Sequence, residues 1–125
     1  MKVHQNVLRI ALTVGALIDG GIAIVALFVP QLMGPLFDVP SRDPTGTLLA
    51  GGEFLVAAFI YVLLLRDSER FRPFLWLVAL DQVLAALLPG IEIARGHIPA
   101  TFKTLAPMPI NAALVIVYVL AARRP

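Results

Sequence analysis

The sequence predicts an all-α protein whose four transmembrane helices form an up–down bundle, and three observations support this fold class. Of the 125 residues, 59% are hydrophobic and only 14% are charged, whereas soluble domains carry about 45–50% apolar and about 25% charged residues. The mean hydropathy is +0.89. The apolar residues gather in runs of roughly the 20 residues that a helix needs to cross a bilayer core of about 30 Å. We therefore expect a single integral membrane domain over residues 1–125.

The predicted spans cover residues 10–29, 46–65, 74–93 and 104–122. Pro30 ends the first run, and the charged segment 66–70 ends the second. The first run is longer than the apolar core of a signal peptide, which has about 7–15 residues, so we expect it to be retained as a span. The connection 66–73 is short, which makes the second and third spans antiparallel neighbours. The connection 30–45 is long enough to lie over one mouth of the bundle.

The distribution of Lys and Arg predicts the orientation. The N-terminal segment, the connection 66–73 and the C-terminal segment hold seven of these residues: Lys2, Arg9, Arg66, Arg70, Arg72, Arg123 and Arg124. The two remaining connections hold three: Arg42, Arg95 and Lys103. Because cytoplasmic loops carry an excess of basic residues, we expect both termini in the cytoplasm and the chain in the inner (plasma) membrane of the cell.

The composition argues against several classes of function. Without cysteine there are no disulfides, redox thiols or thiolate metal sites. The only two histidines, His4 and His97, lie outside the apolar runs, so we expect no metal site. The net charge is +2, and the basic residues flank the apolar runs, which does not favour a nucleic-acid partner. No Gly-rich phosphate loop is present, and we expect no cofactor.

Each predicted span carries a strongly polar residue deep in its apolar run: Asp19, Glu53, Asp81 beside Gln82, and Asn111. A charged side chain at the bilayer centre costs at least about 2.5–3.5 kcal/mol on insertion scales. No Lys or Arg lies within the predicted spans, so we expect at least one carboxyl group to be protonated at neutral pH. At ~1.5 Å per residue, all these positions fall in the middle third of the bilayer. The sequence therefore predicts one polar layer across the bundle.

Small residues share the helix face of two of the acids: Ala16, Ala23 and Ala26 beside Asp19, and Gly46, Ala50 and Ala57 beside Glu53. Such residues mark the side on which a neighbouring backbone approaches in a membrane. We therefore expect Asp19 and Glu53 to face the bundle interior. Dimerisation through exposed small residues of the first or second span is a further expectation.

Several segments of the chain resemble a known family. The first span runs through Ile18-Asp19-Gly20 to Pro30, the Gly- and Pro-containing segment 34–40 follows, and then come a Gly-led second span and the turn 66–73. This order resembles the small bacterial four-helix integral membrane proteins of the BphX-like type and related domains of unknown function. The resemblance implies a four-helix membrane fold. It supplies no activity and no catalytic residues.

The favoured function is a membrane enzyme that performs cofactor-independent acid–base chemistry on a lipophilic small molecule. Isomerisation, cyclisation and epoxide opening all suit carboxyl groups that differ in protonation. We expect Asp19 and Glu53 to form the catalytic acid/base pair and Asp81 to orient or tune one of them. The expected substrate-binding residues are Asn111, Gln82 and Tyr118.

Two other functions stay open. A small proton-coupled transporter of lipophilic compounds is one, since small multidrug exporters also use an acid in the first span. The other is an accessory or structural membrane subunit, in which the polar residues only hydrogen-bond one another and fix the helix register. We interpret Tyr61 and Tyr118 as interfacial or core residues rather than as catalysts.

Overall fold

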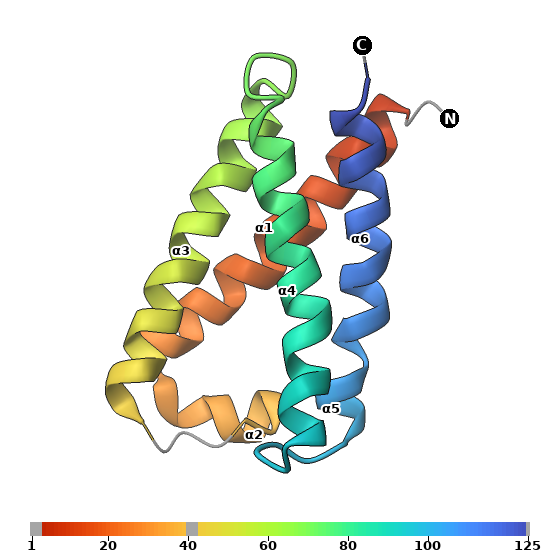
Figure 1. Cartoon of the computed structure of the whole chain (residues 1–125). Helices are drawn as coiled ribbons and strands as arrows, with labels where there is room; N and C mark the ends of the chain where they lie inside the picture. The colour runs from red at the N-terminus through yellow and green to blue at the C-terminus, as the bar shows by residue number, and fades with distance from the viewer. Residues whose placement is uncertain (1–3, 40–42, 125) are drawn as a thin grey trace.

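The computed structural model describes residues 4–39 and 43–124. Within these residues the chain is helical, and no strand is present. Helices α1 (Gln5–Phe28), α3 (Pro44–Arg66) and α4 (Phe74–Ala94) are each long and apolar enough to cross a membrane, as is the segment Phe102–Ala122. By length and composition the chain is a multi-pass membrane protein. The predicted all-α class with four long apolar spans is confirmed (Figure 1).

The first and fourth spans begin earlier than predicted, as does α3 at Pro44. Helix α1 begins at Gln5, because the His4 side chain caps it by accepting a hydrogen bond from the Asn6 backbone N–H at 3.3 Å. The fourth span consists of α5 (Phe102–Leu105) and α6 (Pro107–Ala122). Pro107 occupies the first turn of α6, where a helix has no use for the missing N–H.

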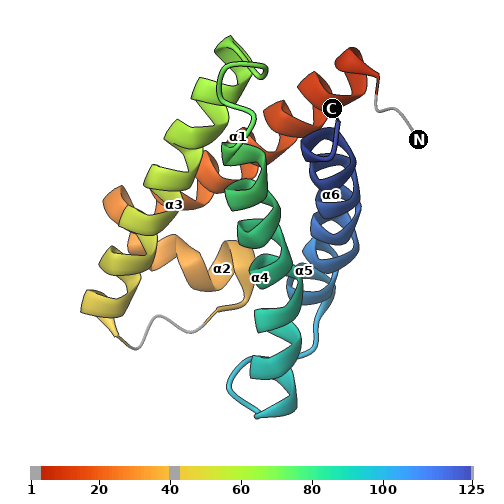
Figure 2. The same cartoon turned by 45° about the horizontal axis from the view of Figure 1, so that its top comes forward.

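The four long segments form two pairs. Helix α1 packs mainly against α3, and α4 mainly against α6, while the contacts of α1 with α6 and of α3 with α4 are less extensive. Successive long helices run in opposite directions, so the two termini lie at the same end (Figure 1). Helix α1 lies obliquely: it is beside α6 near the termini and beside α3 further along (Figures 1 and 2). The pairs therefore diverge away from the termini.

Small residues bring α1 and α3 together. Ala23 and Ala26 on α1 are fully buried, and Gly51 and Ala57 are buried on α3. A Cβ atom at Gly51 would lie 2.9 Å from the Leu27 side chain and 3.0 Å from that of Ala26. Glycine is therefore required at this contact, in the way that small residues serve helix pairs in membranes.

The connection after α1 crosses the far end of the molecule. It contains a 3-10 turn η1 (Pro30–Leu32) and α2 (Met33–Phe37), and α2 contacts α5 (Figures 1 and 2). The Thr101 hydroxyl donates to Asp38 Oδ2 at 2.7 Å, and Lys103 Nζ donates to the Pro35 carbonyl at 2.6 Å. The described part of this connection thus covers one end of the bundle, as the sequence predicts.

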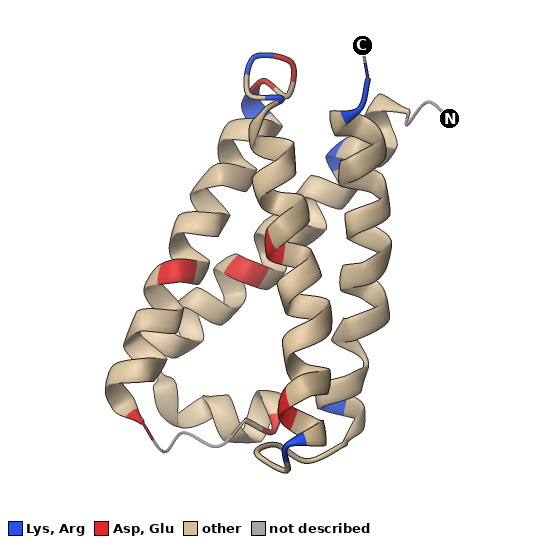
Figure 3. Cartoon of the chain, viewed as in Figure 1, with Lys and Arg blue, Asp and Glu red and all other residues tan. Residues whose placement is uncertain are grey.

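Charged positions of the described chain, other than three mid-helix acids, gather at the two ends (Figure 3). At the end with the termini lie six of the basic residues used to predict the orientation: Arg9, Arg66, Arg70, Arg72, Arg123 and Arg124. Arg95 and Lys103 lie at the other end. Lys2 and Arg42 fall outside the described residues.

Candidate functional site

Five side chains from all four spans meet in what we call the buried polar cluster: Asp19, Tyr61, Asp81, Gln82 and Tyr118. Asp19 is 1% exposed, and Tyr61, Gln82 and Tyr118 are fully buried. Asp81 is partly buried. Three of the four helices supply one member each, and α4 supplies two adjacent ones. The cluster therefore connects the two helix pairs.

The tyrosines and the glutamine form a hydrogen-bonded series. Gln82 Nε2 donates to the Tyr61 hydroxyl at 2.6 Å, and the Tyr118 hydroxyl donates to the Ala11 carbonyl at 2.6 Å. The two rings lie 5.9 Å apart at a tilt of 52°, and the Tyr61 hydroxyl also interacts with that of Tyr118. A buried tyrosine needs a partner for its hydroxyl, and here each has one.

Gly15 makes room for both rings. A Cβ atom at this position would lie 2.5 Å from Tyr61 Cε1 and 2.7 Å from the Tyr118 hydroxyl oxygen. Real side chains do not approach so closely, so the tyrosines rest directly on the backbone of α1. Gly15 lies one helical turn from both Ala11 and Asp19, which places the tyrosines next to the acid.

Asp19 and Asp81 lie against each other, and their carboxyl groups interact. Two carboxyl groups can share a hydrogen bond only when at least one carries a proton. Three oxygen atoms of the cluster have no hydrogen-bond partner among the described residues although they are buried: Asp19 Oδ2, Asp81 Oδ2 and Gln82 Oε1. The cluster thus has more acceptors than donors, which is costly away from water.

A groove of about 650 Å³ runs along α3 and reaches α4. It is lined by Leu48, Leu49, Gly52, Glu53, Val56, Ala57, Ile60 and Asp81. Two carboxyl groups therefore face an otherwise apolar lining, Glu53 from α3 and Asp81 from α4. Through Asp81 the groove borders the buried polar cluster.

The orientation of Glu53 corrects the sequence prediction. The prediction placed Glu53 in the bundle interior, but the side chain is exposed on the surface of α3 at the groove. The physical reason is the arrangement in pairs: α3 packs closely on α1 but only loosely on α4. Glu53 therefore lies at the open groove between α3 and α4 and not in a packed interface.

Asn111 belongs to a different part of the core. It is 4% exposed on α6, and its Oδ1 atom has no hydrogen-bond partner among the described residues. It precedes Tyr118 by seven residues, or about 10 Å along the helix. The expected single polar layer therefore forms only in part: Asp19, Asp81 and Gln82 come together with Tyr118, and Glu53 joins them across the groove.

Tyr61 is the member of the cluster that the sequence interpretation undervalued. It lies inside the predicted span 46–65, and its hydroxyl group must find a partner there because lipid tails offer none. Gln82, on the span that follows along the chain, is such a partner. The need of the Tyr61 hydroxyl for a hydrogen bond within the span could therefore have indicated that Tyr61 belongs to the buried polar cluster.

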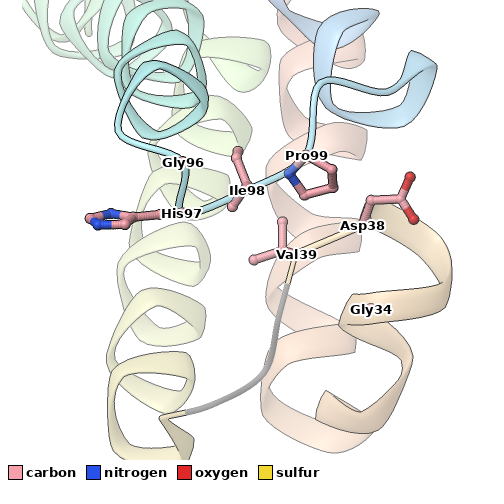
Figure 4. A pocket seen from close by; sticks show the side chains of 7 residues that line it. All are labelled: Gly34, Asp38, Val39, Gly96, His97, Ile98 and Pro99. Atoms are coloured by element: carbon pink, nitrogen blue, oxygen red, sulfur yellow. The ribbon is translucent and has the colours of Figure 1, made fainter.

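A second pocket, of about 510 Å³, lies at the end covered by α2. Figure 4 shows Val39, Ile98 and Pro99 near one another, while the side chains of Asp38 and His97 point away in opposite directions. His97 instead pairs with Glu92 at 2.7 Å. No polar groups converge in this pocket, and no three Asp, Glu or His side chains of the described residues lie close enough to hold a metal ion.

Comparison with known proteins finds no matching family model, no similar curated protein and no similar solved structure. The BphX-like resemblance therefore stays a prediction that depends on the sequence segments alone.

Proposed function

We propose that this protein is an integral membrane enzyme that performs cofactor-independent acid–base chemistry on a lipophilic small molecule. One observation carries the proposal: the groove along α3 presents two carboxyl groups, of Glu53 and Asp81, within an apolar lining. A mostly apolar concave site with a few polar groups is the usual form of a small-molecule site. The groove is reached from the side of the helices, so a substrate enters from the membrane.

The geometry favours a different pair from the one predicted. Glu53 and Asp81 share the groove and act as the acid and base, while Asp19 lies behind Asp81 and interacts with it. In an isomerisation, one carboxyl group donates a proton to the alkene or carbonyl group of the substrate. The other group, as a carboxylate, removes a proton from another position of the same molecule. The substrate keeps its composition, and the proton count of the enzyme is unchanged.

The test uses lipophilic material extracted from the purified protein. The variants Glu53→Gln and Asp81→Asn, in lipid nanodiscs, are expected to retain a substrate that the wild type converts. When their extracts are mixed with wild-type protein, the chromatographic retention time of one compound should shift. Its mass should stay the same for an isomerisation or cyclisation and should increase by one water molecule for epoxide opening. Glu69→Gln, in the exposed connection 66–73, is the matched control and should behave like the wild type.

Extracts that stay unchanged on mixing would refute the enzyme proposal. Uptake of a lipophilic compound driven by a pH gradient in liposomes would then support a transporter. An inert protein would leave the accessory subunit, in which the cluster serves structure alone.

We also propose that both termini face the cytoplasm of the inner (plasma) membrane, since six described basic residues lie at that end and two at the other. The chain has no cysteine, so single cysteines report topology cleanly. In intact cells an impermeant maleimide should label Ala100→Cys, whereas Ser68→Cys should react only after permeabilisation. The reverse pattern would invert the orientation.

A further inference from the structure

The buried polar cluster, which adjoins the groove at Asp81, has oxygen atoms that lack hydrogen-bond donors. Gln82 Nε2 donates to Tyr61, and the Tyr118 hydroxyl donates to Ala11, while the Tyr61 hydroxyl interacts with Tyr118. The hydroxyl donors of both tyrosines are therefore already used within the hydrogen-bonded series. Asp19 Oδ2, Asp81 Oδ2 and Gln82 Oε1 stay buried without a partner among the described residues. Of these three residues only Asp81 lines the groove, so it is the one to which a ligand in the groove can donate a hydrogen bond.

The same region also lacks positive charge. The acidic positions midway along α1, α3 and α4 have no Lys or Arg near them in the described chain, because the basic residues lie at the ends (Figure 3). Protonation neutralises a carboxyl group but adds only one donor to it. An ammonium group supplies a full positive charge and up to three N–H donors, and its bond to a carboxylate is among the stronger hydrogen bonds.

The lining of the groove specifies what the ammonium group is attached to. Beside Glu53 and Asp81 the groove presents Leu48, Leu49, Val56 and Ile60. Leu48, Leu49 and Val56 are exposed, with relative exposures of 53%, 66% and 61%, on the lipid-facing side of α3. Such side chains suit a hydrocarbon tail, which packs against them as the equally apolar lipid tails would. A bare inorganic cation would leave this surface unused.

We infer that the groove along α3 binds a lipophilic amine in its ammonium form, with the nitrogen between Glu53 and Asp81 and the hydrocarbon part along α3. The inference rests on the proposed function in one respect, since it assigns the substrate class of the same groove. Charge complementarity with Glu53 and Asp81 and the unpartnered Oδ2 atom of Asp81 favour this occupant over a neutral lipophile.

Binding is measured with three probes of equal chain length on the full protein in phosphatidylcholine nanodiscs, with empty nanodiscs subtracted. Radiolabelled decylammonium should bind, decyltrimethylammonium should compete at least roughly tenfold more weakly because it has no N–H, and decanol should not compete. Glu53→Gln and Asp81→Asn should each weaken decylammonium binding by roughly 10- to 100-fold, as expected for a lost hydrogen bond to a charged group. Glu69→Gln should leave the binding unchanged.

Glu53→Gln keeps the test independent of folding, since Glu53 is exposed and makes no hydrogen bond among the described residues. Equal binding of decanol and decylammonium would overturn the inference. Binding of decylammonium that neither substitution weakens would overturn it as well. A dimer in which a second copy of the chain covers the groove would also overturn the inference. Such a dimer would bind no probe and would dissociate in the variant Glu53→Gln.

The two proposals fail separately. Conversion of an extracted compound without binding of decylammonium would refute the amine and keep the enzyme. Binding of decylammonium by a protein that converts nothing would keep the amine site and refute the enzyme.

Discussion

The buried polar cluster and the groove along α3 adjoin at Asp81, yet they are built in opposite ways. In the cluster the tyrosine and glutamine donors have fixed partners at 2.6 Å, and the rings rest on the backbone of α1. In the groove, Glu53 has neighbours that are mainly apolar and lies exposed at mid-span. The difference separates two tasks: the cluster holds the helix pairs together, and the groove, in the proposed function, offers its two carboxyl groups to a ligand.

The largest expected effect comes from filling the space at Gly15. The variant Gly15→Ala places a methyl group within 2.5 Å of the Tyr61 ring and 2.7 Å of the Tyr118 hydroxyl. Overpacking typically costs about 1–3 kcal/mol, and we expect the upper part of this range because two rings must move. Thermal unfolding in detergent measures the loss. Gly21→Ala, at a position with nothing within 4 Å of the added carbon, is the control and should unfold like the wild type.

If Gly15→Ala were as stable as its control, the tyrosines would not rest on α1, and the cluster would not join the pairs.

The next effect is the loss of one hydrogen bond in the cluster. Tyr61→Phe keeps the ring but removes the acceptor of the Gln82 Nε2 group. Hydrogen bonds between membrane helices average about 0.6 kcal/mol and reach about 1.7 kcal/mol, and the Gln82 side chain is fully buried, so we expect about 1.5 kcal/mol. The double variant with Gln82→Leu should cost less than the sum of the two single ones. Strict additivity in that cycle would contradict a direct bond.

A smaller effect belongs to the far end of the bundle. Lys103→Met removes the donor to the Pro35 carbonyl at 2.6 Å and the ion pair with Asp38 at 3.8 Å. The Lys103 side chain is 49% exposed, so solvent screens the pair and the loss should be about 0.5 kcal/mol. Limited proteolysis of the connection 30–43 should accelerate while the unfolding midpoint barely changes. A large drop of that midpoint would mean that α2 takes part in the core.

The sequence predicted the spans because the length of an apolar run and the bilayer thickness are directly linked. It predicted the burial of Asp19 for a similar reason, since Ala23 and Ala26 mark the face that meets α3. It could not predict that Glu53 is exposed, although Ala57 marks a comparable packed face on α3. Run lengths do not say which helices pair, and the loose contact of α3 with α4 leaves Glu53 uncovered at the edge of its packed face.

The smallest expected effect on stability is the most informative for the comparison. Glu53→Gln changes a side chain that is exposed and has no hydrogen bond among the described residues, so the free energy of unfolding should change by no more than about 0.5 kcal/mol. Binding of decylammonium should nevertheless fall. Tyr61→Phe should show the opposite combination, with lower stability and a smaller change in binding. If Glu53→Gln unfolded as easily as Tyr61→Phe, Glu53 would have a structural partner, and the separation between groove and cluster would collapse.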